Sequence, residues 1–174
     1  MKKISWTLFL LSVIMVSISC KKSNDAESSN NYYFKAKFDG SSKEFNTTVV
    51  ATKSSLGAGI YSLVITGMTG TEQSALSLWS DKDDFTAGKT FTINALNGTT
   101  YNLLAFVTPL GSSTPTSQWT STYSYGAVPQ SLQCTITEAT TTYIKGTFSS
   151  VIYQNNDVVV AKKIITEGQF YAKF

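Results

Sequence analysis

The sequence predicts an all-β fold over residues 32–174: a single antiparallel β-sandwich or a partly open β-barrel. Two observations predict it. From residue 32 onward, apolar and polar residues alternate with a period of two, and turn-forming residues recur about every 8–12 residues. No long apolar stripe with helical spacing interrupts this pattern. The whole chain has 174 residues, which is enough for one ordinary domain.

The expected strands follow one another along the chain. The first, residues 34–38, places Phe34, Ala36 and Phe38 on one face and ends at an Asp39-Gly40 turn. The other segments with strand character are residues 45–51, 60–66, 75–79, 90–95, 101–107, 119–125, 132–138, 142–153 and 158–174.

Turn and breaker residues indicate how some of these segments are arranged. Asn97-Gly98 predicts a hairpin between residues 90–95 and 101–107. We expect residues 119–125 to form an edge strand. Gly168 is expected to interrupt the last segment with a bulge.

The two ends of this region carry similar segments. Phe-Lys-Ala-Lys-Phe at residues 34–38 resembles Phe-Tyr-Ala-Lys-Phe at residues 170–174. Either two amphipathic strands coincide by chance, or both segments line the same core as neighbours in one sheet.

The N-terminus has the pattern of a targeting segment. Lys2 and Lys3 precede an apolar run over residues 4–18, which is shorter than the roughly 20 residues needed to span a bilayer. The run ends at Ser19-Cys20 and resembles a bacterial lipoprotein signal, in which a small residue precedes an invariant cysteine. The resemblance implies cleavage before Cys20, thioether lipidation of its sulfur and acylation of the new amine. An ordinary secretory signal and a retained membrane helix are the alternatives.

This interpretation divides the chain into three parts. Residues 1–19 are a lipoprotein signal peptide, residues 20–31 are the lipidated cysteine and a flexible polar tether, and residues 32–174 are the β-domain. The second cysteine, Cys134, shares a strand face with Leu132 and Ile136, so we expect a buried, inert thiol.

Composition narrows the classes of function. The chain contains no histidine and no arginine, which excludes a Ser-His-Asp or Cys-His catalytic system, a histidine-ligated metal and an arginine clamp on phosphate. Without residues 1–19, 12 lysines face 11 acids, a net charge of +1 with no concentrated basic patch. We therefore expect no nucleic-acid partner.

The densest group of carboxylates is the loop after Trp79. Asp81, Asp83 and Asp84 could supply some of the oxygen ligands that Ca²⁺ needs, although the loop lacks the glycine and distal glutamate of an EF-hand and contains Lys82. A solvated turn is the simpler interpretation, and calcium is the one cofactor left open. The other acids do not select a catalytic pair.

An aromatic row offers a candidate ligand site. Trp119, Tyr123 and Tyr125 share one face of residues 119–125, and an exposed row of flat rings can stack on sugar rings. Covering the core and forming a protein interface are the alternatives for this row. Trp79, beside the acidic loop, is a second candidate.

Three short motifs extend the resemblance beyond the signal. They are Phe-x-Ala-Lys-x-Asp-Gly at residues 34–40, Ile-x-Gly-x-Phe at 144–148 and Ile-Thr-x-Gly-x-Phe at 165–170. Together with the N-terminus, they resemble many small, uncharacterised Bacteroidota lipoproteins. The resemblance implies a single β-sandwich anchored at the outer membrane, on its periplasmic or cell-surface face, and supplies no catalytic residues.

The combined expectation is a non-catalytic envelope lipoprotein that acts as a binding or accessory module, with a glycan as the ligand class. A structural or protein-interaction subunit of an envelope complex is the alternative. A hydrolase built on carboxylates is the third possibility, which the absence of histidine and arginine disfavours.

Overall fold

Alternating side chains give most strands one apolar side, and two layers of strands close over these sides. The computed structural model describes residues 32–93, 95–96, 99–100, 102–109, 117–121, 131–154 and 161–174. The chain divides into two units, residues 1–30 and 31–174, and all of the described strands belong to the second. In the described part no helix is long and apolar enough to cross a bilayer.

Six strands form the first layer, in the order β2-β1-β13-β12-β11-β6. Their bounds are β1 (Tyr33–Phe38), β2 (Ser41–Phe45), β6 (Thr90–Thr92), β11 (Ser131–Ala139), β12 (Tyr143–Gln154) and β13 (Lys162–Lys173).

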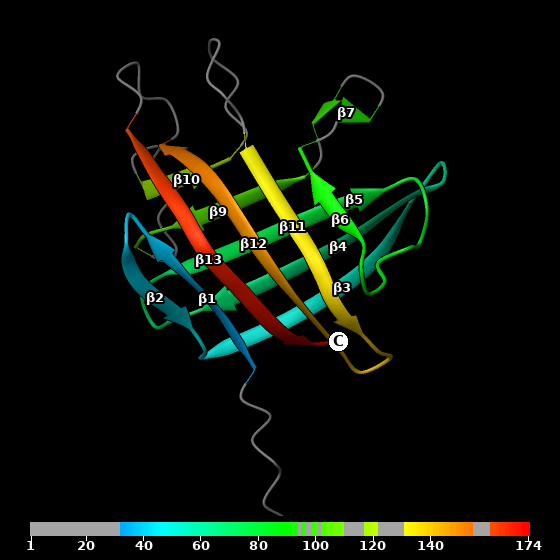
Figure 1. Ribbon diagram of the computed structural model, residues 1–174, viewed down its shortest axis with the longest axis horizontal. Helices are drawn as coiled ribbons and strands as arrows, with labels where there is room; N and C mark the ends of the chain where they lie inside the picture. Colours follow the sequence, from blue (N-terminus) through cyan, green and yellow to red (C-terminus); the bar gives the residue numbers. More distant parts are fainter. Residues whose placement is uncertain are drawn as a thin grey trace, which may run out of the picture. The chain divides into compact units, whose positions relative to one another are not determined.

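Five strands form the second layer, in the order β3-β4-β5-β9-β10, and they cross behind the first layer in Figure 1. Their bounds are β3 (Thr48–Gly57), β4 (Ile60–Met68), β5 (Gln73–Ser80), β9 (Leu103–Val107) and β10 (Gln118–Thr120). A separate two-stranded ladder pairs β7 (Ala95–Leu96) with β8 (Thr99–Thr100).

Two short pairings join the layers into one 11-stranded sheet. At one corner, Lys173 at the end of β13 makes a parallel bridge to Val50 of β3. At the other, β10 pairs with β12 through Trp119 and Thr120. Every pairing except the β13–β3 bridge is antiparallel among the described residues, so the predicted all-β sandwich or partly open barrel is confirmed.

The core lies between the layers and is rich in phenylalanine. Phe34 of β1 is fully buried, with ring centroids 4.9 Å from Phe148 and 5.9 Å from Phe45. From the second layer, Phe106 approaches Phe38 at 5.0 Å. Burying a side chain of this size contributes about 1.5–3 kcal/mol, so the inward-facing rings hold the two layers against each other.

The two similar terminal segments are neighbours. β1 and β13 pair antiparallel, Phe34 lies opposite Phe170, and both rings face the core. The two segments therefore line the same core as neighbouring strands, which was the second of the two explanations for their similarity. The Asp39-Gly40 turn after β1 has positive φ at both residues, as a tight two-residue hairpin requires.

One expected arrangement is only partly present, and another is wrong. The antiparallel pairing expected on either side of Asn97-Gly98 is present but short, because β7 and β8 pair with each other. Among the described residues it does not extend to β6 and β9, since β6 pairs with β11 in the first layer and β9 pairs with β5 in the second. β10 is not an edge strand, because it lies between β9 and β12.

The predicted bulge in the last strand is confirmed. Against both β1 and β12, β13 has one extra residue around Thr166 and Glu167. Glu167 adopts φ +52°, in the left-handed region that non-glycine residues seldom occupy. Bulges of this kind redirect side chains and often lie beside functional sites.

Candidate functional site

The outer face of the six-stranded layer presents two rows of polar side chains across its strands. The register aligns residues from β2, β1, β13, β12, β11 and β6, although these strands are far apart in the sequence. We call these the polar rows: Ser42, Lys37, Thr166, Ser149, Gln133 and Thr92 in the first, and Glu44, Lys35, Gln169, Thr147, Thr135 and Thr90 in the second. Glu167 follows Thr166 in the bulge of β13 and bonds to Lys37 of the first row.

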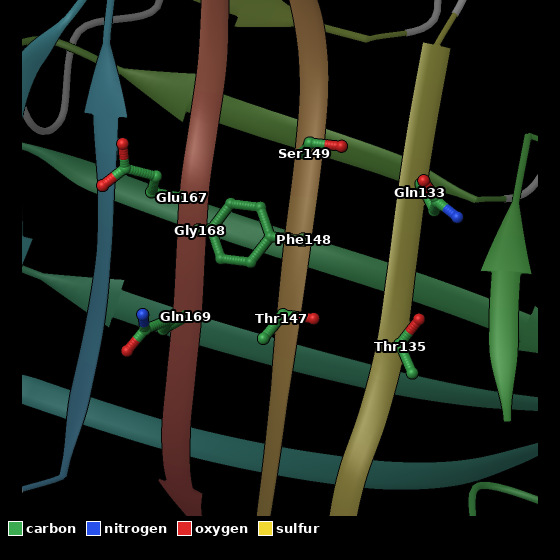
Figure 2. Close-up of a pocket in the computed structure, with 8 residues that line it drawn as sticks. All are labelled: Gln133, Thr135, Thr147, Phe148, Ser149, Glu167, Gly168 and Gln169. Carbon is green, nitrogen blue, oxygen red and sulfur yellow. The ribbon is translucent and has the colours of Figure 1, made fainter. Parts of the chain in front are cut away.

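The polar rows are hollowed into two adjoining depressions. One, of about 400 Å³, lies over β13, β12 and β11, and Figure 2 shows Gln133, Thr135, Thr147, Ser149 and Gln169 around it. The other, of about 490 Å³, lies over β2, β1 and β13. Glu167 and Gln169 line both depressions, so together they form one groove across the sheet.

The bulge shapes the middle of this groove. Gly168 faces the core, where the ring of Phe148 occupies the space that a side chain would need, and its neighbours Glu167 and Gln169 are exposed on the groove side. The Glu167 carboxylate accepts a hydrogen bond from Lys37 at 2.7 Å while its side chain stays 64% exposed. The groove therefore has an accessible carboxylate at its centre, held by one cation.

Four half-buried tyrosines border the groove. We call Tyr32, Tyr33, Tyr143 and Tyr171 the tyrosine cluster. Ring centroids of Tyr171 lie 4.8 Å from Tyr32, 6.1 Å from Tyr33 and 5.2 Å from Tyr143, all edge-to-face. Lys35 lies 4.5 Å from the Tyr33 ring centre and Lys145 lies 4.8 Å from that of Tyr171. The polar rows thus adjoin an aromatic wall.

A hydrogen-bonded network fixes one edge of the cluster. Lys145 donates to Glu138 at 2.8 Å, and the Tyr143 hydroxyl donates to the other oxygen of the same carboxylate. The bonds from Lys145 and Tyr143 hold the pKa of Glu138 below its usual value. The same carboxylate raises the pKa of Lys145 and of Tyr143. All three groups therefore keep their neutral-pH charge states.

The chemistry of the groove suits a neutral polar ligand. Its hydroxyl groups can donate and accept hydrogen bonds, and its side-chain amides can do both with a defined geometry. Its charged groups strengthen the individual hydrogen bonds that they make. The adjacent rings can cover the apolar faces of a flat or chair-shaped molecule. A linear chain laid across the strands would meet both features at once.

The predicted aromatic row is only partly within the described residues. Trp119 faces the core on β10, partly buried, and Lys163 lies 4.5 Å from its ring centre. Tyr123 and Tyr125 lie outside the described residues, so the row as a ligand site stays a prediction. Trp79 projects from the outer face of β5, where its indole N–H donates to Ser77 at 2.9 Å.

The acidic loop forms ion pairs. Asp84 bonds to Lys89 and to Ser80, and Asp83 lies 3.6 Å from Lys53. Partial burial raises the pKa of Asp84, but its bonds to Lys89 and Ser80 outweigh this effect and hold the value below the usual one. Over the described ranges, no three histidine, cysteine or acidic side chains come together as a metal site would require, and Asp81, Asp83 and Asp84 form no such group.

The expectation for the second cysteine is confirmed. Cys134 is fully buried on β11 between Leu132 and Ile136, and burial raises the pKa of its thiol to about 12. Such a thiol is inert toward oxidants and metals at neutral pH. Cys20, the predicted lipidation site, lies outside the described residues.

Sequence reasoning missed the groove and the tyrosine cluster. Alternation in β1, β12 and β13 already showed that Lys35, Thr147 and Gln169 point away from the core. The missing information was which strands are neighbours, since the groove exists only when five strands are set in register.

Comparison of the chain with protein-family models, with curated proteins and with solved structures finds no match.

Proposed function

We propose that this chain is a lipid-anchored, non-catalytic protein of the bacterial outer membrane whose groove binds a carbohydrate. The observation that carries the binding proposal is the juxtaposition of a polar, hydroxyl- and amide-lined groove with the tyrosine cluster on one sheet face. Sugars need both features, because their hydroxyls require hydrogen-bond partners and their C–H faces favour aromatic rings.

The size of the groove supports an oligosaccharide. The five strands that line it, spaced about 4.8 Å apart, span roughly 19 Å, enough for several sugar rings in a row. Glu167 and Gln169 stand where the two depressions meet, so a bound chain would contact both residues at its middle. We assign the ligand contacts to the polar rows and the stacking to Tyr33 and Tyr171.

The anchoring proposal rests on the sequence around Cys20. The basic residues at the N-terminus, the apolar run and Ser19-Cys20 support lipid attachment, and the polar residues up to 31 support a tether. Several acyl chains on one residue would make a stable anchor. Intact-mass measurement of the purified chain tests this directly: the expected N-terminus is a triacylated or diacylated Cys20, and a free thiol there would refute it.

Binding is tested with the full chain on an array of neutral and acidic glycans. We expect Gln169→Ala and Thr147→Ala each to weaken the best ligand about 3–10-fold, because each removes one net hydrogen bond of about 0.5–1.5 kcal/mol. Tyr171→Ala removes a stacking surface and should weaken binding at least as much. The matched control is Thr66→Ala on the outer face of the other layer, which should bind as the unaltered chain does.

Two further outcomes locate the site. If the double variant Trp119→Ala/Tyr123→Ala loses glycan binding while the single variants Gln169→Ala and Tyr171→Ala keep it, the ligand binds at the aromatic row of residues 119–125 and not in the groove. If no glycan binds a chain with an intact circular dichroism spectrum, the carbohydrate proposal is wrong.

A further inference from the structure

The bulge of β13 presents two successive side chains on the groove side of the sheet. Thr166 and Glu167 are both exposed, whereas the residues on either side of them, Ile165 and Gly168, are buried. In a regular strand one of the two exposed residues would turn inward, because successive side chains point to opposite faces. The extra residue, with Glu167 at φ +52°, therefore places a carboxylate on the outer face, and strain of this kind is typical of functional sites.

The Glu167 carboxylate is only partly used by the protein itself. Lys37 donates to its Oε1 at 2.7 Å, and among the described residues its Oε2 accepts no hydrogen bond. A carboxylate offers about four lone-pair positions, so roughly three remain for a ligand. The Lys37 side chain is 38% exposed against 64% for Glu167, so the acceptor is presented to the groove more fully than the cation that holds it.

The charges of the groove are unevenly distributed between its two depressions. Among the residues that line the depression over β13, β12 and β11, the one charged side chain is Glu167, and the other polar groups are hydroxyls and amides. The depression over β2, β1 and β13 is lined by four further charged residues: Lys35, Lys37, Lys43 and Glu44.

These further charges leave no cation in surplus. Lys43 lies on the other side of β2, opposite the buried Ala36, and bonds to Glu72. Lys35 lies opposite Glu44 in the register. The lining side chains that face outward are therefore two lysines and two glutamates, Lys35 and Lys37 with Glu44 and Glu167, so the groove has no net positive charge with which to hold an anion.

A carboxylate at the middle of such a groove favours one class of sugar. Its two oxygens can accept hydrogen bonds from two neighbouring hydroxyls of one ring, and charge-assisted bonds are roughly twice as strong as neutral ones. A uronic acid or a sulfated sugar would bring a second negative charge to the same place, and like charges about 4–5 Å apart repel each other. Glu167 would therefore both strengthen the binding of neutral sugars and disfavour anionic ones.

We infer, on the basis of the carbohydrate-binding function proposed above, that Glu167 determines the specificity of the groove. Its carboxylate accepts two adjacent hydroxyls of a neutral sugar at the middle of the bound chain and excludes anionic sugars from that position. Lys37 is a positioning residue, since it holds the carboxylate between β13 and β1, the side toward which Glu167 extends in Figure 2. The ligand class is thus a neutral, hydroxyl-rich oligosaccharide.

The test adds matched pairs of oligosaccharides to the array of neutral and acidic glycans, with the full chain as the binding protein. The pairs are hexamers of glucose, mannose and galactose and of the corresponding uronic acids. Within each pair the linkage is the same, and the exocyclic group is hydroxymethyl in the neutral member and a carboxylate in the acidic member. The best ligand should be neutral and should bind at least about tenfold more tightly than its uronic acid counterpart.

Glu167→Gln keeps the size of the side chain and removes its charge. It should weaken the best neutral ligand about 5–20-fold and lower the ratio of neutral to acidic affinity at least about tenfold, because the repulsion is lost together with the strong acceptor. Lys37→Met should weaken the neutral ligand about 3–10-fold and leave the uronic acid rejected. The matched control is Asp83→Asn, which removes a similarly exposed carboxylate outside the groove and should change neither affinity.

The outcomes separate this assignment from the proposed function. If the best ligand is anionic, or if both members of its pair bind equally, Glu167 does not determine specificity, although carbohydrate binding stands. The assignment is also overturned if Glu167→Gln weakens both members by the same factor, as a purely structural role would. If no glycan binds the folded chain, the carbohydrate proposal itself is wrong.

Discussion

Replacing Gly146 with alanine should destabilise the β-domain by an amount that the structure allows us to work out. Gly146 faces the core on β12, directly opposite Phe170 of β13 and Ile136 of β11. A Cβ at this position would lie 2.6 Å from the carbonyl oxygen of Thr135 and 2.7 Å from Cε1 of the Phe170 ring. The ring can turn away, but the carbonyl belongs to the neighbouring strand and moves only with its backbone.

The expected loss is about 2–3 kcal/mol in the free energy of unfolding. Overpacking in a buried site costs typically 1–3 kcal/mol and occasionally more, and a clash that includes backbone belongs at the upper end. The alanine also reduces the entropy of the unfolded chain, which offsets about 0.4–1 kcal/mol. For a domain of this size the midpoint of thermal unfolding should fall by roughly 8–12 °C.

Urea unfolding followed by circular dichroism measures this change, with Gly70→Ala as the matched control. A Cβ at Gly70 meets no atom within 4 Å, and its φ is not positive, so the same substitution should be neutral or slightly stabilising there. Combining Gly146→Ala with Phe170→Leu should cost about 1 kcal/mol less than the sum of the two single changes, because the smaller side chain makes room. The reasoning is refuted if Gly146→Ala lies within about 0.5 kcal/mol of the unaltered chain.

Three further predictions concern charge, the thiol and the core. Because bonds from Lys145 and Tyr143 lower the pKa of Glu138 from 4.5, its stabilisation is present above that value and is lost as the pH falls through the lower folded pKa. The unfolding midpoint of Glu138→Gln should therefore lie below that of the unaltered chain at pH 7, and the difference should shrink as the pH falls below 4.5. Cys134 should not react with a disulfide reagent at pH 8 until the chain is denatured, when one thiol should appear if Cys20 is lipidated and two if it is not. Phe34→Ala should cost about 3–5 kcal/mol in urea unfolding.

Each of these three predictions can be contradicted by a specific result. A difference between Glu138→Gln and the unaltered chain that stays constant as the pH falls from 7 to well below 4.5 would contradict the linkage. Rapid labelling of Cys134 in the folded chain would show that the first layer opens. Tyr33→Ala, one residue before Phe34 and on the outer face, should cost much less than Phe34→Ala, and equal losses would contradict the assignment of faces.

The positions that sequence reasoning placed correctly have local causes. Alternation in residues 34–38 and 132–136 determines which side chains turn inward, because successive residues of a strand point to opposite faces. Asp39-Gly40 specifies its turn through backbone conformations that few other residue pairs adopt. Gly168 marks the bulge of β13 for a steric reason, because a Cβ there would lie 2.5 Å from the carbonyl oxygen of Phe148.

The sequence-based expectations that are wrong concern which strands pair with each other. Asn97-Gly98 suggested that residues 90–95 and 101–107 pair, but β6 and β9 lie in different layers. Trp119 had the alternation of an exposed strand, whereas β10 is paired on both sides and turns the ring toward the core. In both cases the local pattern correctly indicates a strand or a turn, but it does not show which other strands pair with that segment.

By itself, the sequence determined the fold class, the inward face of most strands, the inert environment of Cys134 and the absence of histidine and arginine chemistry. Only the tertiary structure decided that Gln133, Thr147 and Gln169 line one groove and that Glu167 stands at its middle beside Lys37. The physical reason is that strands pair through backbone groups common to nearly all residues. The choice of neighbours therefore depends on how the whole core closes, and the groove follows from that choice.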